Sequence, residues 1–284
     1  MCLLITLFKV MPSAPLIVAA NRDEWYERPA VAITTLRQAA PRVLGGRDEV
    51  AGGTWMAVNE HGVVAGLTNL PSPQGRDPAK RSRGELPVAL AAHQDAAAAV
   101  AWICAAVDPA DYNPCWLMVG DRESLFYVDL TGGSRPTVRE LPAGTYVLEN
   151  APLLPQSAKA RHVAGLITEA FAAGDGDVRG ALAAVLGDHS PLPGASPRVG
   201  SQRVGSPRVG SPPDGSPRVG SPRVATPQGA SPGGLSAACV HADGYGTRSA
   251  MIVIVGAAGR PAVQVSDGPS CQAPLLDVGE LWAG

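Results

Sequence analysis

Met1 is followed directly by a cysteine, Cys2, and a cysteine in this position could act as a nucleophile that carries its own base. Removing the methionine leaves one residue that carries both a thiol and a free α-amine. The α-amine has a pKa of roughly 7.7–8.0, so much of it is neutral at cellular pH and can accept a proton. The thiol is a strong nucleophile once it is ionised. Cys2 is therefore a candidate nucleophile with its own general base; the alternative is that it is only the first apolar residue of an edge strand.

A charged triplet, Arg22-Asp23-Glu24, lies further along the chain, just after the apolar run Leu16–Ala20. If the first two apolar runs of the chain pair as a hairpin, Asp23 comes close to Cys2, and its carboxylate could hold the α-amine or the thiol. Arg22 could lower the pKa of the thiol through its positive charge. A solvated turn is the alternative interpretation, but the preceding apolar run places the triplet at the end of a buried strand.

Composition and charge exclude several classes of function. The net charge of −2 gives no electrostatic basis for binding nucleic acid. The apolar run Leu3–Phe8 is too short to span a membrane, and it lacks the basic region that begins a signal peptide. We therefore expect a cytoplasmic protein with a small-molecule substrate or ligand, no nucleic-acid partner and no transmembrane segment. The sequence leaves the oligomeric state open.

The spacing of cysteine, histidine and glycine suggests no cofactor. The five cysteines are an odd number without a Cys-x-x-Cys pair, which argues against a disulfide framework and against a zinc site. The five histidines show no ligand spacing. Gly45-Gly46 and Gly52-Gly53 lack the Walker lysine, so we expect turn glycines there. We expect no metal, and we expect the cysteines other than Cys2 to be core residues. These are Cys104, Cys115, Cys239 and Cys271.

The pattern of apolar residues predicts strands and helices in alternating groups. The expected strands are 2–8, 16–22, 54–59, 62–69, 115–120, 124–130, 137–141, 145–150, 250–255 and 262–266. The expected helical ranges are 82–107, with a capping box at Ser82–Glu85 and a break near Gln94, then 157–174, and 177–186 capped by Asp177. We expect 137–141 to pair with 145–150. This order predicts antiparallel sheets covered by helices, in the α+β class.

One segment departs from this pattern. Between Pro193 and Gly234 the chain repeats Ser-Pro-Arg-Val-Gly with small variations. A sequence dominated by Pro, Gly and Ser cannot bury enough apolar surface to offset its ordering entropy. We therefore expect a single domain spanning 1–284, interrupted by a disordered insertion at 193–234. The alternative is a tether for an anionic partner, because the repeat carries several arginines.

Six strings in this order resemble the NRDE family, also called the transport-and-Golgi-organisation family. They span residues 1 to about 255 and read NRDEWYERP, GGRDEVAGGTW, GLTNLP, SRGEL, VLENAP and GYGTRSA. The family is similar in turn to the N-terminal-nucleophile hydrolases, and most of all to the choloylglycine hydrolases and penicillin V acylases, which also begin Met-Cys. The resemblance implies a four-layer αββα sandwich with antiparallel sheets.

The resemblance also implies a role for individual residues. Cys2 is similar to the nucleophile, and Asp23 to the carboxylate that holds the amine and thiol of that nucleophile. Asn69 is similar to the asparagine whose main chain helps to bind the oxyanion, and Asn150 to the one whose side-chain amide is the second donor. Arg248 resembles an arginine that supports the nucleophile electrostatically.

Two further residues, Asn21 and Arg22, are expected to support the site. The hydrolases carry their arginine two residues earlier, where this chain has Ala20, so the match at Arg22 is approximate. Asn69 and Asn150 also have a simpler interpretation as turn caps at strand ends before prolines. Arg248, likewise, could be only a surface charge.

These residues imply acyl transfer or hydrolysis at a non-peptide amide or an acyl thioester, with no cofactor. The alternative is a non-catalytic binding and trafficking protein, because members of the NRDE family are associated with secretory-pathway organisation and with handling of haem, acyl-CoA and lipids. Haem would be the ligand of interest in that case. A third interpretation is an interaction protein that acts through its arginine-rich insertion.

Overall fold

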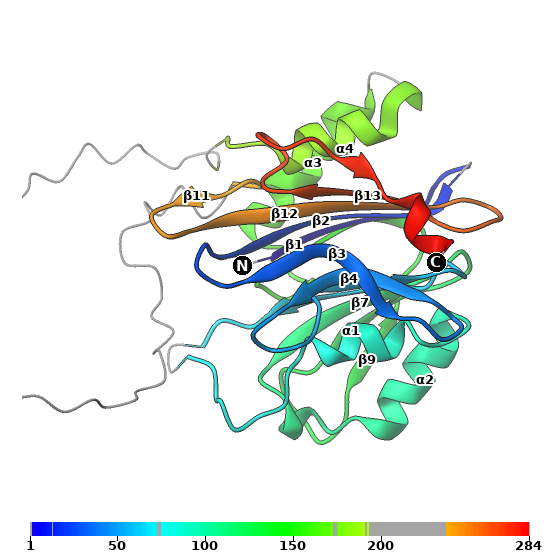
Figure 1. Cartoon of the computed structure of the whole chain (residues 1–284), viewed down its shortest axis with the longest axis vertical. Coiled ribbons are helices and arrows are strands. Elements are labelled where there is room, and N and C mark those ends of the chain that lie inside the picture. The colour runs from blue at the N-terminus through cyan, green and yellow to red at the C-terminus, as the bar shows by residue number, and fades with distance from the viewer. Residues whose placement is uncertain are drawn as a thin grey trace, which may run out of the picture.

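The protein is described here by a computed structural model that covers residues 2–12, 14–72, 75–172, 175–190, 192 and 237–283. Two antiparallel sheets lie face to face, and helices cover the outer side of each (Figure 1). The first two strands of the chain lie in one of these sheets, where the second of them pairs with a strand from the C-terminal part of the chain. Strands that are distant in the sequence thereby come to lie side by side.

The first sheet has seven strands in the order β10-β1-β2-β12-β13-β14, with β11 paired to β12. The expected hairpin between the first two strands is confirmed, with Cys2 paired to Arg22. The bounds are β1 (Cys2–Met11), β2 (Ala14–Trp25), β10 (Gly144–Leu148), β11 (His241–Ala242), β12 (Tyr245–Val255), β13 (Ala262–Asp267) and β14 (Leu276–Asp277).

The second sheet is a meander of seven strands in sequence order, from β3 to β9. Each strand pairs with the next through short connections, except that α1 and α2 intervene between β6 and β7. The bounds are β3 (Ala30–Arg37), β4 (Val43–Asp48), β5 (Met56–Asn59), β6 (Val64–Asn69), β7 (Cys115–Gly120), β8 (Leu125–Asp129) and β9 (Thr137–Glu140).

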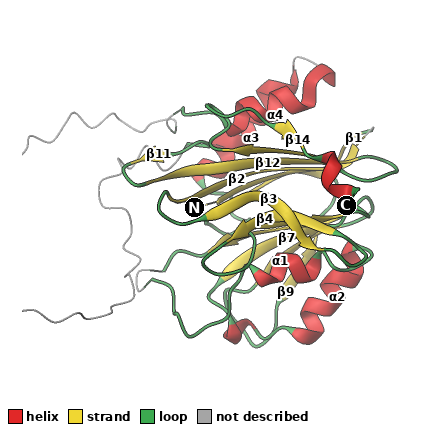
Figure 2. Ribbon diagram, viewed as in Figure 1, coloured by secondary structure: helices red, strands yellow, loops and turns green. Residues whose placement is uncertain are grey.

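Helices α3 and α4 cover the first sheet, and helices α1 and α2 cover the second (Figure 2). Asp95 caps α2 by accepting a hydrogen bond from the Ala98 amide, and Asp177 caps α4 as expected, by accepting one from the Gly180 amide. The bounds are α1 (Glu85–Leu90), α2 (Ala96–Ala106), α3 (Ala158–Ala172) and α4 (Val178–Leu186), with short 3-10 turns at Pro109–Asp111, Asp175–Asp177 and Gly279–Trp282.

Strand alternation divides the side chains of β2 between two cores. Leu16, Val18 and Ala20 belong to the core between the two sheets, whereas Ile17 and Ala19 belong to the core under α3 and α4. A third core, together with a small cluster of Val43, Ala57 and Ala91, fills the space between the second sheet and α1 and α2. Three apolar cores therefore separate four structural layers, and the expected α+β class and four-layer αββα sandwich are confirmed.

The first helix does not begin at the predicted capping box. Gly84 occupies the N-cap of α1, and no side chain caps it. The Gly84 carbonyl instead accepts a hydrogen bond from the Thr54 amide at 2.9 Å. A Cβ atom on Gly53 would lie 2.4 Å from the Gly84 carbonyl carbon, so the chain is held there by backbone packing between two glycines. The predicted break near Gln94 is confirmed by the separation of α1 from α2.

The strand pairing expected between 137–141 and 145–150 is wrong. Strand β9 pairs with β8 in the second sheet, and β10 pairs with β1 in the first. The connection between β9 and β10 therefore carries the chain from one sheet to the other. Two strands that follow each other closely need not pair when each finds its partner in a different sheet, and the local sequence does not show which partner is available.

Two other predictions are corrected. Gly45 and Gly46 lie within β4 rather than in a turn. Glycine is needed at position 46 because a Cβ atom there would come within 2.1 Å of the Trp55 ring. Gly52, with a φ of 72°, is a turn glycine as expected. Of the four cysteines expected in the core, Cys104 and Cys271 are exposed. The insertion at 193–234 lies outside the described residues.

Candidate functional site

The candidate site lies at one end of the first sheet, where β1 runs between β10 and β2. Cys2 is paired with Arg22 on the β2 side. On the β10 side, Leu4 is paired with Leu148, where β10 ends, and Asn150 follows two residues later. Neighbouring strands lie about 4.8 Å apart. The start of β1, which carries the expected nucleophile, therefore lies between Arg22 and the segment that carries the expected oxyanion donor.

Asp23 is a buried carboxylate opposite Thr247 of β12. The Thr247 hydroxyl donates a hydrogen bond to Asp23 Oδ1 at 2.6 Å. The Tyr245 hydroxyl donates to the Asp23 main-chain carbonyl at 3.1 Å. Burial raises the pKa of the Asp23 carboxyl, and the positive charge of Lys159 opposes that rise. The ionised form of Asp23 therefore depends on nearby cations and donors, which suits a carboxylate that holds an amine.

Lys159, on α3, is a residue that the sequence reasoning missed. It is only 5% exposed, and its ammonium nitrogen makes no hydrogen bond to any residue that the structure describes. It shares the buried face of α3 with Ala160, Val163 and Ile167. A lysine within an apolar helical face is the sequence signal that could have identified it. Thr247 offered no such signal, because threonine is common in strands.

Arg22 lies on the face of β2 opposite to Asp23, by strand alternation. Its guanidinium stacks over the Trp55 ring, 4.6 Å from the ring centroid, and the ring itself packs against Gly46. The side chain is 4% exposed and lies 3.7 Å from the carboxylate of Asp48 and 3.8 Å from that of Glu24. The charged triplet is therefore not a solvated turn, because the sheet directs its first two members into separate cores.

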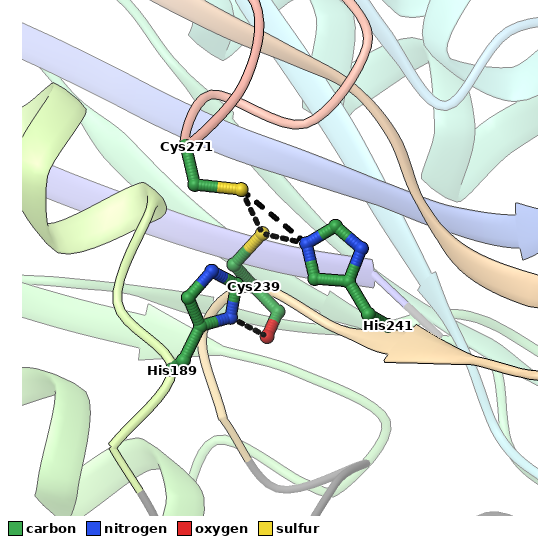
Figure 3. Close-up of side chains that lie close together, drawn as sticks. All are labelled: His189, Cys239, His241 and Cys271. Atoms are coloured by element: carbon green, nitrogen blue, oxygen red, sulfur yellow. Dashed lines mark hydrogen bonds between the residues drawn. The ribbon is translucent and has the colours of Figure 1, made fainter.

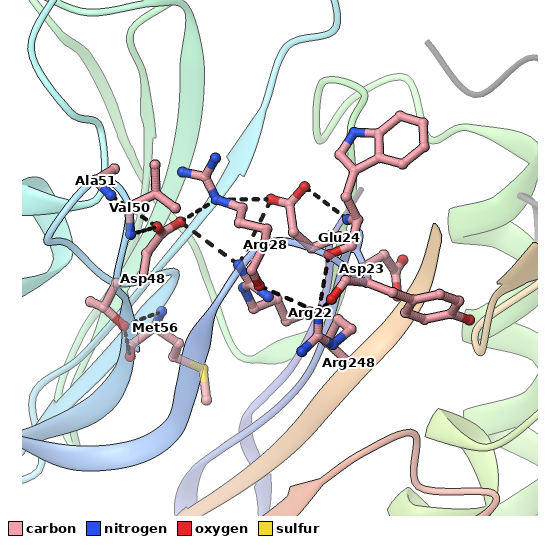
Figure 4. Close-up of polar contacts among 12 residues, drawn as sticks. Arg22, Asp23, Glu24, Arg28, Asp48, Val50, Ala51, Met56 and Arg248 are labelled. Carbon is pink, nitrogen blue, oxygen red and sulfur yellow. Dashed lines mark hydrogen bonds and ion pairs between the residues drawn. The ribbon is translucent and has the colours of Figure 1, made fainter. Parts of the chain in front are cut away.

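Asp48 anchors this arrangement from the second sheet (Figure 4). It accepts a hydrogen bond from Arg28 Nε at 2.8 Å and further bonds from the Val50 and Ala51 amides. Although burial acts to raise it, these hydrogen bonds hold the pKa of the Asp48 carboxyl below its ordinary value. Asp48 is thus a fixed negative charge that faces the buried Arg22 guanidinium across the two sheets.

Arg248 lies in a bulge of β12, between the pairs that Thr247 and Ser249 make with β2. Its guanidinium donates hydrogen bonds to three main-chain carbonyls at the end of β2 and in the turn that follows it (Figure 4). The acceptors are Trp25 at 3.0 Å, Tyr26 at 2.6 Å and Arg28 at 3.3 Å. Arg248 is therefore close to the end of the sheet that carries the site, and its described contacts bind the turn after the NRDE string.

Asn69 and Asn150 meet although they come from opposite sheets. Asn69 ends β6 in the second sheet, and Asn150 follows β10 in the first. Asn150 Nδ2 donates a hydrogen bond to the Asn69 carbonyl at 2.5 Å, and the Asn150 amide donates to Glu149 Oε2 at 2.8 Å. The two expected oxyanion residues are therefore joined directly, and the position of one fixes the other.

Asn21, expected to support the site, is completely buried on the α3–α4 side of β2. Its Nδ2 donates hydrogen bonds to the carbonyls of Leu186 and Ala238, both at 2.8 Å. These carbonyls lie at the end of α4 and in the segment that returns to β11. Asn21 therefore ties two distant parts of the chain to the strand that carries Arg22 and Asp23.

A cluster of potential metal ligands is formed partly by residues of these same two segments (Figure 3). One ligand atom from each of its four residues lies within 4.8 Å of those of the others. Burial and the neighbouring Cys271 thiol raise the pKa of the Cys239 thiol to about 12. Burial and His189 lower the pKa of His241. The spacing argument against a zinc site overlooked this cluster, which we call the Cys/His cluster and which consists of His189, Cys239, His241 and Cys271.

Comparison with known protein families identifies the family to which the chain belongs. The family described as Transport and Golgi organisation 2 matches residues 1–265. The chain belongs to this family. The Transport and Golgi organization protein 2 homolog of Bos taurus is 29% identical over 277 residues, which cover 91% of this chain and 90% of that protein. The homologs of Homo sapiens and Mus musculus match over 93 residues, at 38% and 37% identity, and these matches span 33% of each protein.

Solved structures with a similar arrangement are distant in sequence. A Caenorhabditis elegans N-acylethanolamine-hydrolyzing acid amidase ortholog has 12% identity and a TM-score of 0.47, covering 65% of this chain and 85% of that one. Penicillin V acylase from Agrobacterium tumefaciens has 10% identity and a TM-score of 0.39, covering 98% of each chain. Similarity at this level says nothing about substrate. Among the residues that the structure describes, no helix is both long enough and apolar enough to cross a bilayer.

Proposed function

We propose that this protein is an N-terminal cysteine hydrolase-like protein that acts on a non-peptide amide or an acyl thioester. The observation that carries the proposal is the register of the first sheet. It pairs Cys2 with Arg22 on one side, and on the other side it pairs Leu4 with Leu148, two residues before Asn150. A nucleophile, a cation and an amide donor thereby share one end of the sheet, and the buried Asp23 is next to Arg22 in sequence.

The reaction begins once Met1 has been removed, so that Cys2 carries the free α-amine. The amine accepts the thiol proton, and the sulfur forms a bond to the acyl carbon while the carbonyl π electrons move to the oxygen. Collapse of this intermediate expels the amine or thiol leaving group, which takes the proton from the ammonium. A water molecule, deprotonated by the same α-amine, then adds to the acyl carbon. Collapse of this second intermediate breaks the carbon–sulfur bond and releases the carboxylic acid, and the ammonium returns its proton to the Cys2 sulfur.

The developing oxyanion needs donors that are already in place. We assign this role to the main chain at Asn69 and the side-chain amide of Asn150. A side-chain amide has two N–H donors, and the hydrogen bond to the Asn69 carbonyl fixes the plane of the Asn150 amide. Because Asn69 ends β6 in the second sheet and Asn150 follows β10 in the first, the oxyanion site would be built from both sheets.

Charges around the nucleophile divide into two groups. Asp23, held by Thr247, is assigned to bind the Cys2 ammonium and so orient the base. Arg22, on the other face of β2, is assigned to favour the thiolate through its positive charge. Asp48 and Trp55 fix the position of the Arg22 guanidinium, so that its charge does not depend on a mobile side chain.

Two measurements on the full-length protein test the proposal. Intact mass is expected to show removal of Met1, and retention of Met1 would overturn the amine-as-base mechanism. An acyl thioester probe that transfers its acyl group to a thiolate is expected to label the wild-type protein but not Cys2→Ser. The matched control is Cys104→Ser, which removes an exposed cysteine and should label normally. Labelling that survives in Cys2→Ser at the wild-type rate contradicts the assignment of the nucleophile.

A binding protein would behave differently in the same experiments. The carrier alternative predicts a saturable shift of the haem Soret band, or saturable acyl-CoA binding, that is the same in wild type and in Cys2→Ala. It also predicts no probe turnover. That combination of results would replace the hydrolase proposal.

A further inference from the structure

We propose that the Cys/His cluster binds one structural Zn²⁺ ion, beside the candidate active site. Two thiolates and two imidazoles form the donor set. Zinc prefers this mixed nitrogen and sulfur set in tetrahedral geometry, whereas magnesium and calcium prefer oxygen ligands. All four positions would be filled by protein side chains, which is typical of a structural site and leaves no place for a catalytic water.

The distances within the cluster match the edges of a zinc tetrahedron. Zinc–sulfur bonds of about 2.3 Å and zinc–nitrogen bonds of about 2.0–2.1 Å imply ligand separations of roughly 3.8 Å between two sulfurs and roughly 3.6 Å between sulfur and nitrogen. Cys239 Sγ lies 3.6 Å from Cys271 Sγ and 3.6 Å from His241 Nε2. His241 Nε2 lies 3.3 Å from Cys271 Sγ. These three atoms thus form one face of the expected polyhedron.

His189 supplies the fourth ligand. Its Nδ1 lies 3.2 Å from the Cys239 carbonyl oxygen, a distance at which an Nδ1–H donates a hydrogen bond. Metal-binding histidines commonly make such a bond with the ring nitrogen that does not bind the metal. The bond leaves the lone pair on Nε2, and Figure 3 shows that nitrogen on the side of the ring that faces the two sulfur atoms.

Charge balance also favours a divalent metal. Binding Zn²⁺ to Cys239 and Cys271 releases two thiol protons, and the two resulting thiolates neutralise the ion. A neutral centre is compatible with the buried Asp23, which is joined through the Thr247 hydroxyl to Val240, the residue next to Cys239. A centre with excess negative charge would repel that carboxylate.

The ligands come from three separate parts of the chain, so a bound metal would hold these parts together. His189 follows α4, Cys239 and His241 precede and begin β11, and Cys271 lies between β13 and β14. The Cys239 amide already donates to the Asp188 carbonyl at 2.9 Å. The metal would therefore cross-link the chain on both sides of residues 191–236 and fasten it to the loop after β13.

The cross-link would also support the position of Asp23. The main-chain amide of Val240, next to Cys239, donates a hydrogen bond to Thr247 Oγ1 at 2.9 Å, and that hydroxyl donates to Asp23. A hydroxyl that accepts from one group and donates to another is fixed in rotation. Zinc bound at Cys239 would hold Val240 in place and, through it, the donor that binds Asp23.

Metal analysis of the full-length protein tests the proposal directly. Protein purified without chelators is expected to contain about one zinc ion per chain, and competition with a chromophoric chelator should report its affinity. Changing a second-shell partner costs about 10–100-fold in affinity, so Cys271→Ser and His241→Ala should each cost more than about 100-fold. The matched controls are Cys104→Ser and His61→Ala, which alter residues outside the cluster and should retain the wild-type affinity.

A second measurement uses only the wild-type protein and therefore does not depend on whether the variants fold. Wild-type protein stripped of metal and titrated with Co²⁺ should develop thiolate-to-cobalt charge-transfer absorption that saturates at one equivalent and disappears when Zn²⁺ is added. No saturable binding of either metal, or unchanged affinity in Cys271→Ser, would overturn the proposal. A Cys239–Cys271 disulfide in protein kept under reducing conditions would do the same.

The zinc site and the hydrolase proposal can fail independently. Cys2 is not a ligand, so Cys2→Ser should keep its zinc even if it loses all labelling by the acyl probe. Conversely, a protein that never reacts with acyl probes could still bind zinc at the wild-type affinity.

Discussion

At the scale of single residues, Asn150 links the two sheets and is the proposed side-chain donor to the oxyanion. Its amide donates a hydrogen bond to the carbonyl of Asn69, which ends a strand of the other sheet, and Asn150 itself follows β10, the strand beside β1. If it stabilises an oxyanion, Asn150→Asp should lower the rate of Cys2 acylation by about 10²–10³-fold, because a carboxylate cannot donate a hydrogen bond to the developing charge. Stopped-flow or gel-based measurement of probe labelling gives that rate.

The control for this variant is Gln94→Ala, which removes an exposed amide far from the site and should label at the wild-type rate. Circular dichroism should show that Asn150→Asp remains folded. A folded Asn150→Asp protein with wild-type labelling would remove Asn150 from the oxyanion site.

Asp23 predicts a pH dependence of stability. Its folded-state pKa is raised above the ordinary value of 3.8, so the folded state holds the proton more tightly than the unfolded state. The resulting stability is present below the unfolded pKa and declines as the pH rises through the folded pKa. In Asp23→Asn this decline should be absent, so its free energy of unfolding, measured in urea between about pH 4 and pH 7, should vary less with pH.

The Thr247 hydroxyl can still donate to an amide oxygen at position 23, which makes asparagine a conservative replacement. A Thr247→Val variant should shift the wild-type decline to higher pH, because it removes a donor that favours the ionised form of Asp23. Identical pH profiles for wild type and Asp23→Asn would show that Asp23 does not titrate in this range.

At the scale of secondary-structure elements, the contact between β4 and Trp55 determines where Arg22 lies. A Cβ atom on Gly46 would come within 2.1 Å of the Trp55 ring. Gly46→Ala should therefore displace the indole and the guanidinium stacked on it, and lower the free energy of unfolding by about 1–3 kcal/mol. Gly132→Ala is the matched control, since nothing lies within 4 Å of the added atom, and chemical denaturation compares the two. Equal stability of both variants would contradict the close approach.

Asn21 joins three elements, namely β2, the end of α4 and the segment before β11. In Asn21→Ala the carbonyls of Leu186 and Ala238 lose their donor while they remain buried. Each such loss costs about 1–3 kcal/mol, so thermal and urea denaturation should show a marked loss of stability. Gln94→Ala again serves as the control. A variant as stable as the wild type would indicate that water replaces the Asn21 amide.

At the scale of the whole molecule, the segment 193–234 and the proposed zinc cross-link can be separated experimentally. Deleting 193–234 leaves His189 and Cys239 in place. Loop-closure entropy changes by only about 0.6 kcal/mol for each doubling of loop length, so the melting temperature should change by only a few degrees, as measured by calorimetry. Zinc content should also be unchanged. A loss of several kcal/mol would show that the segment contributes packing to the fold.

The sequence by itself determined the alternation of apolar residues, the hairpin at the start of the chain and the family strings. Each of these depends on neighbouring residues or on short ordered motifs. Local pattern was therefore sufficient to predict the α+β class, the β1–β2 hairpin and the cap of α4 by Asp177. The four-layer order followed from the family resemblance, and the three apolar cores confirmed it.

Only the tertiary structure decided how residues distant in sequence meet. The pairing of β10 with β1 rather than β9, the meeting of Asn69 with Asn150, and the burial of Lys159 beside Asp23 all depend on contacts between the sheets and their helices. The Cys/His cluster is the clearest case, because its ligands come from three separate segments and have no motif spacing. Long-range packing and strand register produce such sites, and neither is contained in the local pattern of residues.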